Sequence, residues 1–159
     1  YEQFLTSHKS ATHLAAQFSE RYLNTLEQYP AGEWTDIRLM DGLRPGLFES
    51  AVGALMGPRV MGLNPGFKQA FWAFEERLLE ITQGLPRWMN PRPYELRDNL
   101  IGMVGKWVDA AWADYDWQGP DVDWEPIFGA RLSRELAKWF KENFSKSSQQ
   151  GFFTGMIMA

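Results

Sequence analysis

The chain has 159 residues, a formal net charge of −4, no cysteine and an aromatic fraction of 15%. That length fits one domain or part of a larger one, and the acidic balance argues against a nucleic-acid partner, which would need a basic face on the protein. Without cysteine the chain itself supplies no disulfide, no nucleophilic thiolate and no thiolate ligand for a metal. No apolar run reaches the roughly 18 residues that a membrane span requires.

Apolar residues recur at helical spacing along the chain, and no segment shows the strict alternation of a strand. The first helix is predicted over residues 10–28, where a Tyr-Pro-Ala-Gly sequence ends it. The second is predicted over residues 35–56, with a kink or a break near Leu43 because Pro45 lies inside it.

The third predicted helix, over residues 65–83, has a dense aromatic content. Asn64 is a suitable N-cap, and the proline that follows it suits the first helical position. One stripe of this helix carries three rings: Phe67, Phe71 and Phe74. Such stripes usually fill a core, but Trp72 lies off the stripe. Rings on more than one face also suit a helix that lines an apolar pocket.

A proline-rich loop follows this helix, from Leu85 to Pro93, and Trp88 and Met89 make it more apolar than a solvated turn. Three further helices are predicted over residues 93–115, from Asp123 as a possible N-cap, and after residue 148. The connections between helices are short, which favours antiparallel neighbours. The sequence therefore predicts an all-α fold of about six helices that forms a single domain over residues 1–159.

Side chains for catalysis or metal binding do not form a recognisable pattern. His8 and His13 are five residues apart, whereas a metal pair on one helix face needs a spacing of four. Acidic residues such as Asp121 and Asp123 lack the spacing of a calcium loop and suit helix caps or solvated faces. Neither a Gly-x-Ser-x-Gly motif nor a glycine-rich phosphate loop occurs. We therefore predict no catalytic residue and no metal ligand in this chain.

Two stretches, residues 63–88 and 121–135, resemble fungal members of the cytochrome P450 superfamily. The first contains Asn-Pro-Gly-Phe, Phe-Trp-Ala-Phe-Glu and Gly-Leu-Pro-Arg-Trp, and residues 48–57 fit the same pattern. The likeness is nearest to the branch that includes sterol and prostanoid hydroxylases. It implies that the six helices correspond to helices D to H and the first turns of helix I, which form the middle portion of that fold.

The resemblance also implies roles for individual residues. The loop over residues 85–93 would connect helices F and G and cover the substrate channel. The candidate substrate-binding residues are apolar: Phe71, Trp72, Phe74, Leu78, Leu85, Trp88, Met89, Phe152, Phe153 and Met156. Haem is implied by the resemblance alone, since the chain has neither the family's cysteine loop nor its Glu-x-x-Arg motif. The sequence therefore leaves open whether this chain is itself an enzyme.

Three interpretations remain open. In the first, the chain provides the access loop and distal pocket of a haem-thiolate monooxygenase that acts on an apolar small molecule, and a larger fold supplies the rest. In the second, a haem-free descendant binds an apolar ligand or cyclises it within a shaped pocket. In the third, a helical module binds another protein.

The expected partners follow from these interpretations. They are an apolar small molecule and a second chain, the missing half of the fold or further copies of this chain. Nucleic acid is not expected. Family members are often anchored to the endoplasmic reticulum by an N-terminal helix, and the sequence does not predict such a helix here.

Overall fold

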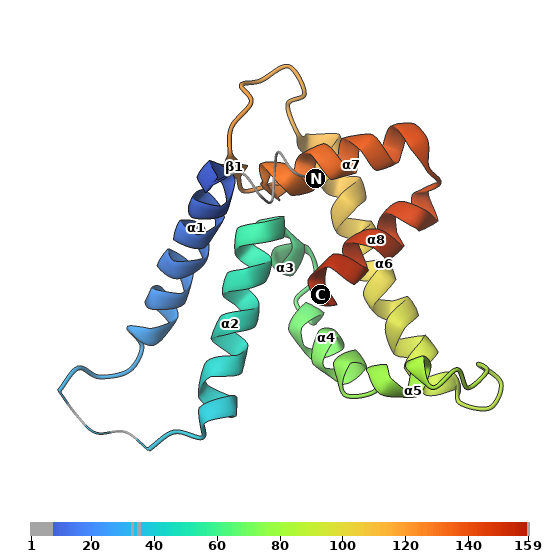
Figure 1. Cartoon of the computed structure of the whole chain (residues 1–159), viewed down its shortest axis with the longest axis horizontal. Coiled ribbons are helices and arrows are strands. Elements are labelled where there is room, and N and C mark those ends of the chain that lie inside the picture. The colour runs from blue at the N-terminus through green and yellow to red at the C-terminus, as the bar shows by residue number, and fades with distance from the viewer. Residues whose placement is uncertain (1–7, 33, 35, 159) are drawn as a thin grey trace. The chain divides into compact units, whose positions relative to one another are not determined.

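The computed structural model describes residues 8–32, 34 and 36–158. Helices dominate these residues, which confirms the all-α fold (Figure 1). The helices within the described part are α1 (His8–Leu26), α2 (Leu39–Met56), α3 (Arg59–Leu63), α4 (Phe67–Glu75), α5 (Leu78–Thr82), α6 (Pro91–Asp114), α7 (Arg131–Asn143) and α8 (Lys146–Met158). Two short strands, β1 (Trp124–Glu125) and β2 (Gly129–Ala130), pair antiparallel.

The chain divides into two compact units. Unit 1 comprises the described residues up to Pro58 together with Asp116–Leu136, and unit 2 comprises Arg59–Tyr115 and the described residues from Ala137 onward. The single domain expected over residues 1–159 stays a prediction, and each unit is described by itself.

In unit 1, α1 and α2 pack along each other. Glycine permits their close approach, because a Cβ at Gly46 would lie 2.6 Å from the Cγ2 of Thr25. The sequence predicts a kink or a break near Leu43; the break is absent, since α2 runs through Pro45, and the kink stays a prediction. The proline removes one backbone hydrogen bond close to the start of the helix, so the rest of α2 stays intact. The predicted start at residue 35 lies outside the described residues, and the helix begins at Leu39.

The helix expected to begin at Asp123 is replaced by a hairpin, and α7 begins only at Arg131. Glu125 explains the turn, since its carboxylate accepts the backbone N–H groups of Ile127 at 2.7 Å and Phe128 at 2.6 Å. Gly129, with φ +77°, then takes a conformation that other residues rarely adopt. The prediction of no strand was wrong for this segment because the turn chemistry outweighs the N-cap signal.

Side chains from the hairpin and from the start of α7 donate hydrogen bonds to backbone carbonyls at the end of α2. The indole Nε1 of Trp124 donates to the carbonyl of Ala54 at 3.0 Å, and the Ser133 hydroxyl donates to the carbonyl of Leu55. The last turn of a helix leaves carbonyls without helical partners, so these two bonds cap it. The Arg134 side chain is 3% exposed and donates to Asp121 and to the carbonyl of Val122, which fixes the segment before β1.

In unit 2, α6 is the central helix, and α3, α4, α5 and α8 each pack against it (Figure 1). Its Trp107 is fully buried and meets the ring of Phe153 edge to face at 5.3 Å. The predicted range of residues 93–115 for this helix agrees closely with Pro91–Asp114. The predicted last helix, placed after residue 148, begins three residues earlier at Lys146.

The predicted third helix, over residues 65–83, is split into α4 and α5. The split occurs because the N–H of Arg77 reaches back only three residues to the carbonyl of Phe74, and Arg77 leaves the helical region at φ −114°. The expected N-cap is also wrong, since α4 begins after Gly66 without a side-chain cap. Asn64 is instead buried, and its amide donates to the carbonyls of Val60 and Met103 at 3.0 and 3.1 Å.

Candidate functional site

All ten predicted substrate-binding residues lie in unit 2, on α4, α5, α8 and the loop after α5. Their exposure differs widely. Phe71, Phe74 and Phe153 are buried, at 7%, 3% and 0% exposed. Five others are half-buried: Trp72, Leu78, Leu85, Phe152 and Met156. Trp88 and Met89 are 80% and 55% exposed, so the structure does not bury these two against the other rings.

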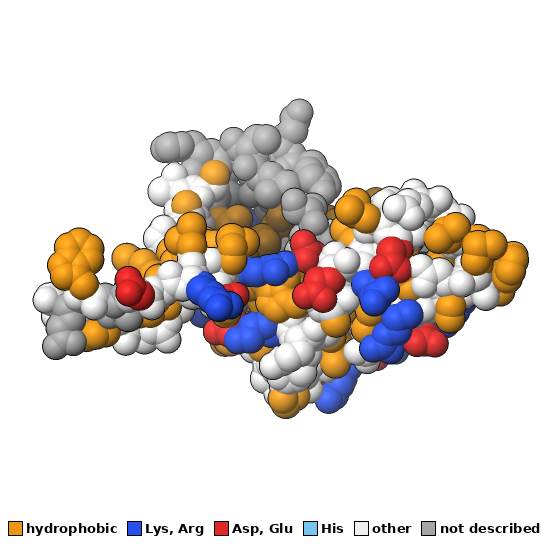
Figure 2. All heavy atoms as spheres, turned by 90° about the horizontal axis from the view of Figure 1, so that it is seen from below, with side chains coloured by type: hydrophobic (Ala, Val, Ile, Leu, Met, Phe, Trp, Pro, Cys, Tyr) orange, Lys and Arg blue, Asp and Glu red, His pale blue; other side chains and the backbone are white. Residues whose placement is uncertain are grey.

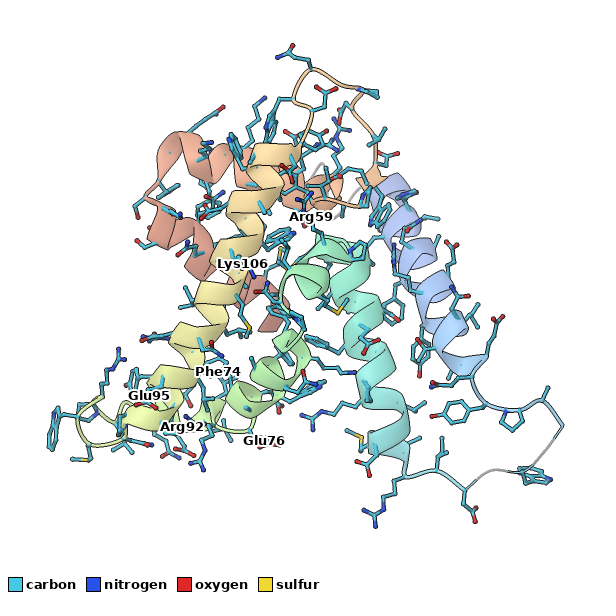
Figure 3. The ribbon with its side chains drawn as sticks, turned by 180° about the vertical axis from the view of Figure 1, so that it is seen from behind. Arg59, Phe74, Glu76, Arg92, Glu95 and Lys106 are labelled. Atoms are coloured by element: carbon cyan, nitrogen blue, oxygen red, sulfur yellow. The ribbon has the colours of Figure 1, made fainter. Side chains whose placement is uncertain are left out.

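The predicted residues form two groups that share α6 as their support. In the first group, on α4, the rings of Phe71 and Trp72 meet edge to face at 4.7 Å. In the second group, on α8, the rings of Phe152 and Phe153 meet edge to face at 5.7 Å. Because α4 and α8 both pack against α6, one helix positions both aromatic groups. Phe74, which is labelled in Figure 3, belongs to the buried side of the first group.

Polar contacts join α3 to α6 and so fix the start of α4. The Asn64 amide bridges the carbonyls of Val60 and Met103, as described above. The Lys106 ammonium donates to the carbonyl of Leu63 at 2.7 Å, and Figure 3 shows Lys106 on the side of α6 that faces α3. Arg59, at the start of α3, pairs with Asp114 near the end of α6. The aromatic helix therefore follows a segment that is anchored along α6.

The loop over residues 84–90 is tied to its surroundings by side chains that the sequence did not suggest. The Tyr94 hydroxyl donates to the carbonyl of Leu85 at 2.6 Å. The Arg87 guanidinium donates to Asp98 at 2.8 Å, and the Asn90 amide donates to Glu80 at 2.7 Å. The four-residue spacing of Tyr94 and Asp98 places both side chains on one face of a helix. The sequence does not show which loop groups these side chains contact.

Asp98 pairs with two arginines in this loop region. Hydrogen bonds from Arg97 at 3.1 and 2.8 Å, and then from Arg87, hold the pKa of its carboxyl below the ordinary value of 3.8. A lowered pKa means that the charged carboxylate is favoured in the folded protein. The stabilisation is therefore complete above pH 3.8 and is lost as the pH falls through the lowered pKa of the folded state.

The largest exposed apolar side chains of this region lie on α5 and at the tip of the loop. Leu79 on α5 is 73% exposed, and Trp88 and Met89 at the tip of the loop are also mostly exposed. Figure 2 shows hydrophobic side chains exposed at the right-hand edge of the face that it presents, with Lys, Arg, Asp and Glu side chains interspersed further in. An apolar tip of this kind is typical of a segment that contacts a ligand or a partner.

Two described cavities lie away from the ten predicted residues. In unit 2, a cavity of about 290 Å³ is lined by residues of α6, the end of α7 and the start of α8, including Val108, Trp112, Lys141 and Phe144. In unit 1, a groove of about 340 Å³ runs between α1 and α2 and is lined by small and apolar residues such as Ala15, Phe18 and Ala54. Both offer alternative places for a small ligand, and sequence reasoning indicated neither.

Metal ligands do not gather in the described part of the chain, where no group of three or more His, Cys, Asp or Glu residues could hold an ion. His13 is half-buried beside α7, and its Nε2 has no hydrogen-bond partner among the described residues. The sequence also has no cysteine. None of the described helices combines the length and apolar character that crossing a membrane requires.

Three curated fungal proteins are similar to the chain. Cytochrome P450 monooxygenase calL of Penicillium decumbens is 39% identical over 159 residues, which cover 99% of this chain and 30% of the relative. Cytochrome P450 monooxygenase fsoE of Humicola fuscoatra is 34% identical over 109 residues, 67% of this chain and 19% of the relative. Cytochrome P450 monooxygenase efuG of Hormonema carpetanum is 28% identical over 126 residues, 73% of this chain and 22% of the relative.

The chain thus spans less than a third of the length of these relatives. No family model matches the chain, and no solved structure matches it.

Proposed function

The chain belongs to the cytochrome P450 family, and on that premise we propose that it forms the access loop and part of the distal pocket of a haem-thiolate monooxygenase with an apolar substrate. In this proposal the helices correspond to the middle portion of the family's fold. The loop over residues 84–90 covers the substrate channel, and α4 and the start of α8 contribute rings to the pocket. The remainder of the polypeptide supplies the haem and its ligand.

One observation carries the proposal. Apolar side chains from α4 to the loop are half-buried, so they are neither fully packed in the core nor fully solvated: Trp72, Leu78, Ile81 and Leu85. A pocket wall needs such side chains, because they are supported from behind and still present an accessible apolar surface. Phe71 and Phe74 provide that support, since both are buried on α4, and α4 packs against α6.

The residues of this chain do not fit the role of haem ligand. The family's haem iron requires a cysteine thiolate, and the chain has no cysteine. In this proposal, oxygen chemistry belongs to the haem that the remainder of the polypeptide would hold. What the residues of this chain do in the proposal is bind an apolar molecule, orient it by ring contacts and limit the entry of water, which are the tasks that a largely apolar pocket performs.

Substitution of Trp72 tests this role. At a ligand concentration of 100 times Kd, an apolar ligand such as a sterol should raise the free energy of unfolding of the full polypeptide by about 2.7 kcal/mol. The Trp72→Leu variant keeps an apolar side chain but loses the ring, so a tenfold weaker Kd is expected. The same ligand concentration should then stabilise the variant by only about 1.4 kcal/mol. Thermal unfolding with and without ligand measures both values.

Trp139→Leu is the matched control. Trp139 is 49% exposed on α7 and is not among the predicted substrate-binding residues. Its variant should keep the full ligand-induced stabilisation. If both variants keep it, Trp72 does not contact the ligand, and the assignment of α4 to the pocket fails.

A further inference from the structure

We propose that Asp98 is the positioning residue that holds the loop over residues 84–90 closed and sets how often it opens. It does so as the centre of a latch, formed by Leu85, Arg87, Tyr94, Arg97 and Asp98. The latch itself is independent of the proposed function. Its consequence, control over substrate entry, rests on that function.

The latch is a continuous chain of contacts between the loop and the first turns of α6. The Tyr94 hydroxyl donates a hydrogen bond to the carbonyl of Leu85 in the loop at 2.6 Å. The Arg97 guanidinium lies 5.2 Å from the centre of the Tyr94 ring, which is a cation–π distance, and it also donates to Asp98 at 2.8 Å. The Asp98 carboxylate also accepts a hydrogen bond from the Arg87 guanidinium of the loop at 2.8 Å. Two loop residues are thus bound by one network.

A second anchor holds the far end of the loop. The Asn90 amide donates to Glu80 of α5 at 2.7 Å, and the other oxygen of Glu80 accepts Arg77 at 2.9 Å. Between the two anchors lie only Trp88 and Met89, both mostly exposed. The tip is therefore free of the packing that buries other large apolar side chains, and polar contacts at its two ends determine its position.

Asp98 is the member whose loss should matter most for opening. It bridges two guanidinium groups, one from α6 and one from the loop, so that its removal leaves Arg87 without this carboxylate. Its side chain is 40% exposed, and partly exposed ion pairs contribute only modestly. A modest contribution suits a loop that must open repeatedly, because local opening then needs little free energy.

Hydrogen exchange of the loop amides in the full polypeptide, without ligand, measures the opening. The N–H groups of Met89 and Asn90 both donate to the carbonyl of Pro86, so they exchange only when the loop turn opens. Asp98→Asn should increase their exchange rates about fivefold, as expected for the loss of a partly exposed ionic network. Asp98→Glu should restore most of the protection, which a purely structural defect would not allow.

Glu95→Gln is the matched control. Glu95 pairs with Arg92 at 3.5 Å on the same turns of α6, and Figure 3 shows both residues on that end of the helix. This pair does not include the loop, so exchange of the Met89 and Asn90 amides should stay within twofold of the unmodified protein. If Asp98→Asn unfolds the protein, Arg87→Gln removes the same contact from the loop side. Unchanged loop exchange in a folded Asp98→Asn or Arg87→Gln protein overturns the latch.

The rate of ligand association separates the latch from the proposed function. With an apolar ligand, Asp98→Asn should raise the association rate constant about as much as it raises loop exchange, whereas Glu95→Gln should not. Faster exchange with an unchanged association rate keeps the latch and rejects this loop as the ligand's entrance. If loop exchange in every variant stays as slow as in the unmodified protein, the latch is rejected, whatever the ligand association rate is.

Discussion

The Gly129→Ala variant is expected to lose about 2–5 kcal/mol of unfolding free energy in unit 1. Two costs combine, because Gly129 has φ +77° and an added Cβ would also lie 2.6 Å from the carbonyl oxygen of Leu55. A positive φ costs an alanine about 1–2 kcal/mol, and overlap with fixed backbone costs a further 1–3 kcal/mol. Chemical denaturation followed by circular dichroism measures the loss.

Gly32→Ala is the control that separates the two costs. Gly32 also lies in unit 1 and has φ +85°, but an added Cβ would meet nothing within 4 Å. The control should therefore lose only about 1–2 kcal/mol. Equal losses in the two variants would show that the hairpin does not approach the end of α2 as closely as described.

The Trp107→Ala variant should lose about 3–5 kcal/mol of unfolding free energy in unit 2, the usual cost of removing a buried tryptophan from a core. Trp107 is fully buried and meets Phe153 edge to face at 5.3 Å. The cavity left behind would lie under α8, so Phe153 should also lose its fixed position. Denaturation together with the aromatic NMR signals of Phe153 tests both effects.

Trp34→Ala serves as the control for this loss, since Trp34 is fully exposed. Its variant should stay within about 0.5 kcal/mol of the unmodified protein, as most surface substitutions do. A small loss in Trp107→Ala would contradict the central place of α6 in unit 2.

Long periodic segments were predictable from the sequence. The range of α6 agrees within two residues at each end, because its apolar residues recur over many turns and a proline marks its start. The family resemblance is confirmed by the fungal relatives, which include one that matches 99% of this chain. Sequence motifs indicated that resemblance although the residues carry no recognisable catalytic pattern.

Features that depend on tertiary contacts were not predictable. The split between α4 and α5 occurs at Glu76 and Arg77, where neither glycine nor proline warns of an ending. The sequence predicts a helix start at Asp123 because this residue is a suitable N-cap, whereas Glu125 and Gly129 form the turn of a hairpin at residues 124–130. The latch joins Tyr94 and Asp98 to the loop that precedes α6. Sequence spacing alone shows only that these two residues share a face of the helix, not which loop groups they contact.

Photoaffinity labelling tests the central claim most directly. The full polypeptide would be irradiated with a sterol or terpene that bears a diazirine, and the modified peptides would be identified by mass spectrometry. We predict labelling of residues 71–89 and 152–156 that an excess of the unmodified ligand suppresses. Suppressible labelling at the cavity of Trp112, Lys141 and Phe144, or at the groove between α1 and α2, with none at residues 71–89, would contradict the account.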